Sequence, residues 1–172
     1  RKGQINWQKM VCYAHNQMEE EAFSSLEKQI FYNKKRADLL RDENVYRNTK
    51  ANEQNLKAWL NILFGKYEEA KKNLEKLKEL QEQVKDPTAM YGYYGLLGMA
   101  NLMEGNYETA VSNFKKADNT NIYFNYFKGL ALKASGSENE AMEMFKELAS
   151  YNFSSWDIAI IRNLAKKQLQ KV

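Results

Sequence analysis

The feature that most constrains the fold is a sequence pattern that recurs after 31 residues. Its matched pairs are Gly98 and Gly129, Gly105 and Gly136, Ala110 and Ala141, and Phe114 and Phe145. Four pairs at one spacing are hard to produce by chance, and self-similarity at such a period is typical of stacked helical repeats. An array of this kind buries its core between neighbouring repeats and leaves an extended surface free for a partner.

The residue types suit a helical hairpin. Gly98 and Ala110 fall where two helices approach closely, and a side chain larger than a methyl group would hold those helices apart. Gly105 falls between two apolar-periodic segments, where a helix C-terminus favours a residue free to adopt positive φ. Phe114 follows Ala110 by four residues, so it shares that helix face and is predicted to reach into the core.

Two further copies extend the pattern upstream. Residues 65–70 read Gly-Lys-Tyr-Glu-Glu-Ala, and a degenerate copy at residues 18–22 reads Met-Glu-Glu-Glu-Ala. With these copies the chain resembles the tetratricopeptide repeat family. The resemblance implies an all-α fold, namely a right-handed superhelical array (α-solenoid) of antiparallel helix hairpins with a C-terminal capping helix. A generic antiparallel bundle is the alternative, but it has no reason to repeat this turn.

The repeats organise the whole chain into one predicted domain, residues 1–172. It comprises a degenerate first hairpin with a charged connector (1–50), repeats at 51–87, 88–121 and 122–153, and a capping helix at 154–172. Helices are predicted at 5–16, 19–31, 52–64, 67–84, 88–104, 107–118, 122–134, 138–151 and 155–171. Ala22, Ala70 and Ala110 are 48 and 40 residues apart, beyond the usual period of about 34. The upstream units are therefore predicted to carry longer helices or connections.

Composition supports helix and leaves the compartment open. The chain has a single proline and 13% aromatic residues, and no run of about 18 apolar residues that could span a membrane. The chain begins with Arg1 rather than Met, so we expect a processed or excised piece. It could then be cytoplasmic, or periplasmic or secreted if a signal peptide was removed. The single cysteine, Cys12, is predicted to be a small core residue.

Residues 32–50 form the most ambiguous segment. Its positive residues are Lys34, Lys35, Arg36, Arg41, Arg47 and Lys50, and its acidic residues are Asp38, Asp42 and Glu43. A basic patch for nucleic acid or an acidic partner is one interpretation. The interspersed acids and the lack of an aromatic platform favour a solvated extension of the second helix followed by a connector.

Catalytic patterns are absent from the sequence. His15 is the only histidine, so a histidine-rich metal site or a triad would depend on that one residue. The eight glycines are spread singly and form no phosphate-binding loop. We therefore predict no catalytic residues, no metal site, no cofactor and no enzymatic activity.

The resemblance also implies a binding surface, because in the family the first helix of each repeat lines the concave face. The residues that take the ligand-facing positions are Asn55, Trp59, Ile62, Met99, Met103, Tyr126 and Lys133, with Gly95, Leu102 and Leu130 beside them. A groove lined by Trp, Tyr and Met suits an apolar or aromatic peptide. The alternative is that several of these residues pack against the adjoining repeat; we expect Tyr126 and Lys133 to be exposed.

Two functions follow from the sequence. The first is a non-catalytic scaffold that binds a protein or peptide, without a small-molecule substrate. The second is a structural module that forms homo-oligomers or packs against another domain of a larger parent protein. The second is suggested by the apolar residues Trp156, Ile158, Ile160 and Ile161.

Overall fold

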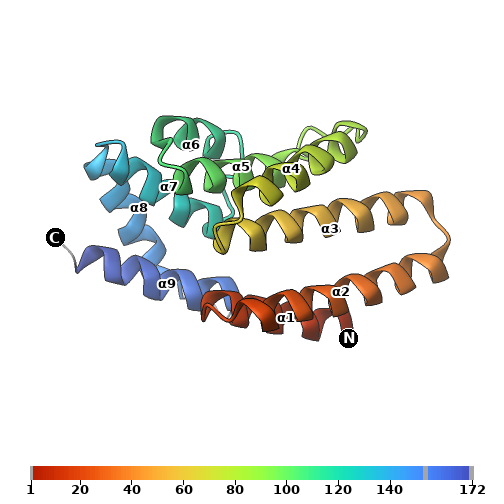
Figure 1. The fold of residues 1–172 in the computed structure, drawn as a ribbon. Coiled ribbons are helices and arrows are strands. Elements are labelled where there is room, and N and C mark those ends of the chain that lie inside the picture. The colour runs from red at the N-terminus through yellow and green to blue at the C-terminus, as the bar shows by residue number, and fades with distance from the viewer. Residues whose placement is uncertain (1, 153–154, 171–172) are drawn as a thin grey trace. The chain divides into compact units, whose positions relative to one another are not determined.

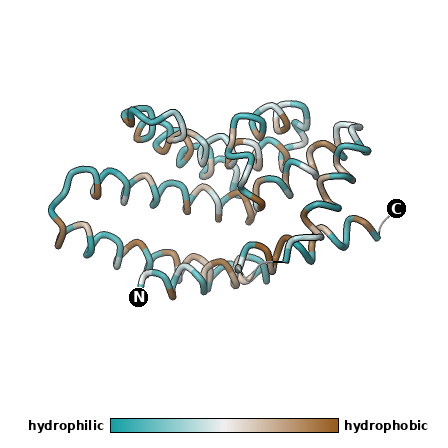
Figure 2. Tube along the Cα trace, turned by 180° about the vertical axis from the view of Figure 1, so that it is seen from behind, coloured by the Kyte–Doolittle hydropathy of each residue, from teal (hydrophilic) through white to brown (hydrophobic). Residues whose placement is uncertain are grey.

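The computed structural model describes residues 2–152 and 155–170, and over these residues it contains nine α-helices and no strand. In chain order they are α1 (Lys2–His15), α2 (Glu19–Leu40), α3 (Glu43–Leu63), α4 (Tyr67–Glu82), α5 (Tyr91–Met103), α6 (Tyr107–Phe114), α7 (Ile122–Ala134), α8 (Glu138–Ser150) and α9 (Trp156–Leu169). The predicted all-α fold is confirmed (Figure 1). Figure 2 shows hydrophobic and hydrophilic residues interleaved along the helices, as amphipathic helices require.

The helices form two compact units. The N-terminal unit, Arg1–Ala89, contains α1 to α4, and the C-terminal unit, Met90–Val172, contains α5 to α9. In the N-terminal unit α1 packs against α2, α2 against α3, and α3 against α4. In the C-terminal unit α5 pairs with α6 and α7 with α8, while α7 also contacts α5 and α9. Each unit is thus built from consecutive helix hairpins, as predicted.

Four hairpins share one turn geometry. In these four turns the residues with positive φ are Gln17 (60°), Gly65 (70°), Gly105 (83°) and Gly136 (90°). In each turn the next residue's N–H donates to a carbonyl five residues earlier, at 2.8 Å for Lys66 to Asn61 and 2.9 Å for Met18 to Tyr13. This is the helix-ending bond of the Schellman motif. The degenerate first copy therefore has the same turn, although Gln17 replaces the glycine.

The recurring small residues lie at buried contacts between paired helices, as the sequence predicted. Ala22, Ala70, Ala110 and Ala141 are all 0% exposed. A Cβ added at Gly98 would lie 2.8 Å from the Phe114 ring, and one added at Gly129 would lie 2.7 Å from the Phe145 ring. Both rings are buried, so the phenylalanine of one helix occupies the space that a glycine leaves on its partner.

The segment of residues 32–50 corrects one prediction. The second helix continues to Leu40, which agrees with the predicted solvated extension. The connector, however, is short, and α3 begins at Glu43, nine residues before the predicted start. Arg41 ends α2 in the left-handed conformation (φ 54°), and the Asp42 side chain caps α3 by accepting from Val45 N–H at 3.0 Å. The long period upstream is thus taken up by two long helices.

A chain of side-chain amides joins α3 to α4. Asn61 Nδ2 donates to Asn73 Oδ1 at 2.9 Å, and Asn73 Nδ2 donates to Gln54 Oε1 at 2.9 Å. Asn61 is buried, so these bonds satisfy amide groups that water reaches poorly.

One local prediction was wrong, and another falls partly outside the described residues. Cys12 is exposed rather than part of the core, so its prediction was wrong. The final helix was predicted over 155–171 with Ser154 in a capping box; Ser154 and Lys171 lie outside the described residues. The observed cap of α9 is Ser155, whose Oγ accepts from Ile158 N–H at 3.4 Å.

Candidate functional site

The residues predicted to line a concave face divide between the two units. Asn55, Trp59 and Ile62 lie on α3 in the N-terminal unit; Met99, Met103, Tyr126 and Lys133 lie on α5 and α7 in the C-terminal unit. Trp59, Ile62, Met99 and Tyr126 are all buried, at 7%, 1%, 0% and 6% exposure. Buried side chains of this kind hold the core and present no surface to a ligand. Asn55, Met103 and Lys133 retain access to solvent.

Tyr126 shows why the expectation of exposure was wrong. Its ring packs against Phe145 with centroids 5.9 Å apart, and its hydroxyl accepts a long hydrogen bond from Gln168 Nε2 at 3.5 Å. Burial raises the pKa of the Tyr126 hydroxyl, while the bond from Gln168 acts in the opposite direction. Contacts from α8 and α9 thus cover a position that α7 alone would leave open.

His15 is a packing residue. Its ring centroid lies 6.0 Å from that of Trp59, so it links α1 to α3 within the N-terminal unit. Burial lowers the pKa of His15, because a charged imidazole loses hydration there. Within the described residues no group of three or more His, Cys, Asp and Glu side chains could hold a metal ion.

Two adjoining pockets flank α3 in the N-terminal unit. The first, about 480 Å³, lies between α3 and α4 and includes Asn55 in its lining; the second, about 280 Å³, lies between α2 and α3. They share Asn48 and Asn52. We call their combined surface the asparagine trough, after the four asparagines Asn33, Asn48, Asn52 and Asn55.

The trough has unpaired hydrogen-bonding groups. Asn48, Asn52 and Asn55 follow one another at helical spacings of four and three, so they share a face of α3. No hydrogen bond joins the four trough carboxamides to another residue in the described part of the chain. Two atoms of the lining that are buried, Arg47 Nε and Gln81 Oε1, also lack a partner within residues 2–152 and 155–170.

The chemistry of the trough suits a peptide backbone. Each carboxamide offers both donors and an acceptor, so one side chain can bond a peptide C=O and a peptide N–H together. Leu80, Val84 and Ala89 supply apolar contact beside these groups. Asp86 is tied by the N–H and hydroxyl of Thr88, both at 2.8 Å, and the backbone bond is the main cause of its lowered pKa.

One group of charges beside the trough is paired within the protein. Lys34 pairs with Glu53 at 2.9 Å and Lys57 pairs with the same carboxylate at 2.7 Å. Burial raises the pKa of Glu53, but the hydrogen bonds from Lys57 and Lys34 outweigh it, so the pKa is lowered. The predicted basic patch is therefore partly neutralised by an acid from α3.

Comparison with known families identifies one of the helical hairpins, the one formed by α3 and α4. Residues 54–84, which begin near the middle of α3 and contain all of α4, match the tetratricopeptide repeat family model. The chain therefore contains a tetratricopeptide repeat at these residues. No curated protein and no solved structure matches the chain. The matched repeat includes the turn at Gly65, whose geometry recurs at Gly105 and Gly136.

The matched repeat has a general role. Tetratricopeptide repeats generally mediate protein–protein interactions, and proteins built from them are typically non-catalytic. Among the described residues, no helix is both long and apolar enough to cross a membrane.

The sequence contained part of the signal for the trough. Asn55 was predicted from the family pattern, but Asn48 lies where a connector was expected, and Asn52 was predicted only as the first residue of the helix. The missed signal was the Asp42 cap, which begins a helix early enough to align the three asparagines.

Proposed function

We propose that the chain is a non-catalytic scaffold that binds a protein partner through an extended peptide segment, with the asparagine trough as its site in the N-terminal unit. The observation that carries this proposal is the row of unpaired carboxamides along α3, beside apolar side chains. The family supports a peptide partner rather than a small-molecule substrate. In the proposed array the hairpins stack as a right-handed superhelix, and Met103 and Lys133 provide further contacts on its concave face.

The test begins with peptides selected from a random library displayed on phage. The bound sequence is then synthesised and titrated by calorimetry against the wild type and the Asn48→Ala and Asn52→Ala variants. Each lost carboxamide should weaken binding by about 1 kcal/mol, or about fivefold. Asn139→Ala, an exposed asparagine of α8, is the matched control and should leave affinity unchanged.

The scaffold should bind with little change in its own secondary structure, because preformed helical surfaces move little on association. Circular dichroism of the complex should therefore equal the sum of its parts, apart from any ordering of the peptide. If both trough variants keep the wild-type affinity, while Lys133→Ala or Met103→Ala weakens binding, the binding site lies in the C-terminal unit instead.

The structural-module alternative retains one supporting observation. Ile158 and Ile161 of the apolar segment in α9 are buried, so they belong to the core rather than to a contact surface. At the end of α2, however, Leu39 is 84% exposed and Leu40 is 52% exposed, beside the turn that Figure 1 shows between α2 and α3. If this end self-associates, light scattering should show a mass that rises with concentration in the wild type but stays monomeric in Leu39→Asp.

A further inference from the structure

A third pocket in the N-terminal unit lies between α1 and α2. Its volume is about 580 Å³, within the range of ligand-binding pockets. The lining residues that matter here are Lys2, Trp7, Gln29, Tyr32, Asn33 and Arg36. Asn33 and Arg36 also line the asparagine trough, so the two surfaces adjoin.

Gln29 places a buried acceptor at this pocket. The residue is 6% exposed, and its Oε1 has no hydrogen-bond partner among the residues that the structure describes. Leaving a buried carbonyl oxygen unpaired costs free energy. A ligand that brings an N–H group into the pocket recovers this hydrogen bond, and so gains affinity from a group that is already in place.

The charged side chains of the pocket are of one sign. Lys2 and Arg36 are its charged lining residues, and neither has an ion-pair partner within the described part of the chain. Lys2 Nζ lies 5.8 Å from the centroid of the Tyr32 ring, which holds the ammonium group near the pocket. A guanidinium can form two parallel hydrogen bonds with a carboxylate, so the pocket matches an anion that also carries an N–H donor.

We propose that this pocket binds an acidic side chain of the partner peptide. The carboxylate pairs with Arg36 and Lys2, a backbone N–H of the same peptide donates to Gln29 Oε1, and Trp7 and Tyr32 contact the methylene groups. The inference rests on the proposed function, because the peptide is the one whose backbone is proposed to bind in the asparagine trough. Arg36 lines both the trough and this pocket. It adds a preference that the uncharged carboxamides of the trough cannot supply.

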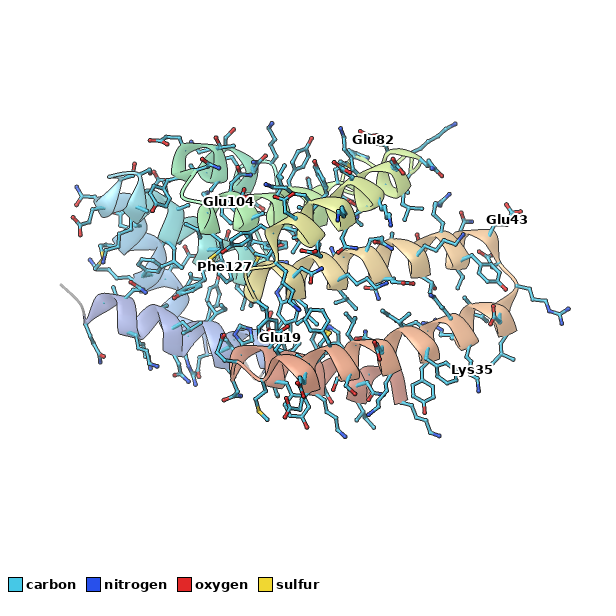
Figure 3. The ribbon with its side chains drawn as sticks, viewed as in Figure 1. Glu19, Lys35, Glu43, Glu82, Glu104 and Phe127 are labelled. Atoms are coloured by element: carbon cyan, nitrogen blue, oxygen red, sulfur yellow. The ribbon has the colours of Figure 1, made fainter. Side chains whose placement is uncertain are left out.

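The probes are two capped peptides, one of three Gly-Glu repeats and one of three Gly-Gln repeats, together with N-acetylglycine. Each is titrated into the isotope-labelled chain, and the amide resonances of Gln29 and the neighbouring backbone are followed by NMR. The variants are Arg36→Gln and Gln29→Met. Lys35→Gln is the control: it removes the same charge from α2, but Lys35 lies outside the pocket lining and points away from α3 (Figure 3).

The expected result is that the glutamate peptide binds more tightly than the glutamine peptide, and that N-acetylglycine shifts the same resonances. Arg36→Gln should weaken the glutamate peptide by about fivefold, and Gln29→Met should weaken all three probes by about fivefold. Lys35→Gln should change little. Thermal melts show whether the Gln29→Met chain still folds. If it does not, Arg36→Gln, at an exposed position, provides the test instead.

The two proposals fail in different ways. Equal binding of both peptides, or equal losses in Arg36→Gln and Lys35→Gln, would overturn the acidic preference while leaving the peptide function standing. If N-acetylglycine shifts the pocket resonances but neither peptide outbinds it, the pocket stands as an anion site and the trough loses its support. No response of the Gln29 resonances to any probe would overturn the inference.

Discussion

The contact between Gly129 and the Phe145 ring offers a quantitative test of how the hairpins pack. A Cβ at Gly129 would lie 2.7 Å from Phe145 Cε1 and 3.0 Å from its Cζ. The ring is 0% exposed, so relieving the contact requires a shift within the core rather than a movement into solvent. We expect the steric cost of Gly129→Ala to be about 1–3 kcal/mol. Alanine recovers about 1 kcal/mol through helix propensity, which leaves a net loss of about 1 kcal/mol.

The same substitution should change sign when the ring is removed. In a Phe145→Leu background the clash is relieved, and Gly129→Ala should be neutral or stabilise by up to about 1 kcal/mol. A double-mutant cycle measured by urea unfolding should therefore give a coupling of about 1–3 kcal/mol. If Gly129→Ala has the same effect in both backgrounds, ring contact is not what keeps this position small, and the repeated Gly98–Phe114 pair loses its explanation as well.

Three further predictions concern the N-terminal unit. Gln17→Gly should stabilise the chain by about 0.5–1 kcal/mol in urea unfolding, because Gln17 has φ 60° and only glycine adopts that region at little cost; a loss instead would show that the glutamine side chain stabilises the turn. The pKa of His15 is lowered in the folded state, so on acidification the unfolded state binds the proton first. Stability should therefore be full above pH 6.5 and fall as the pH drops below it. His15→Gln should reduce this decrease in thermal melts measured across pH 5–8. Lys34→Gln should cost less than about 1 kcal/mol, and 1 M salt should reduce that cost, since the pair with Glu53 is partly solvated; a larger, salt-insensitive loss would contradict this account.

Much of the fold could be predicted because the repeat encodes local rules. The glycine turns, the small contact residues and the phenylalanines act within one hairpin, so their spacing alone indicates the structure. The start of α3 was missed because residues 43–50 are charged and carry little apolar periodicity. Two features set this boundary. Asp42 is a capping residue three positions before Val45, and Arg41 adopts the αL conformation although it is not a glycine.

The candidate site was less predictable, for a physical reason. Whether a residue such as Tyr126 is exposed depends on which other helices cover it, and Phe145 and Gln168 come from elements 19 and 42 residues further along the chain. A helical repeat pattern predicts which face of a helix a residue lies on, but not whether other helices bury that face. The asparagine trough likewise depends on α2 and α4 flanking α3, which spacing along α3 alone cannot reveal.

The amide chain from Gln54 through Asn73 to Asn61 has a consequence for how α3 and α4 can move. Asn73 on α4 is held by two side chains that are seven residues, or about two turns, apart on α3. A slide of one helix along the other by a single turn would break both bonds at once and strand the buried Asn61 amide without water. Apolar side chains alone would tolerate such slippage far more readily. The hairpin therefore has one permitted register, and a partner that binds across α3 and α4 meets a surface whose spacing does not drift.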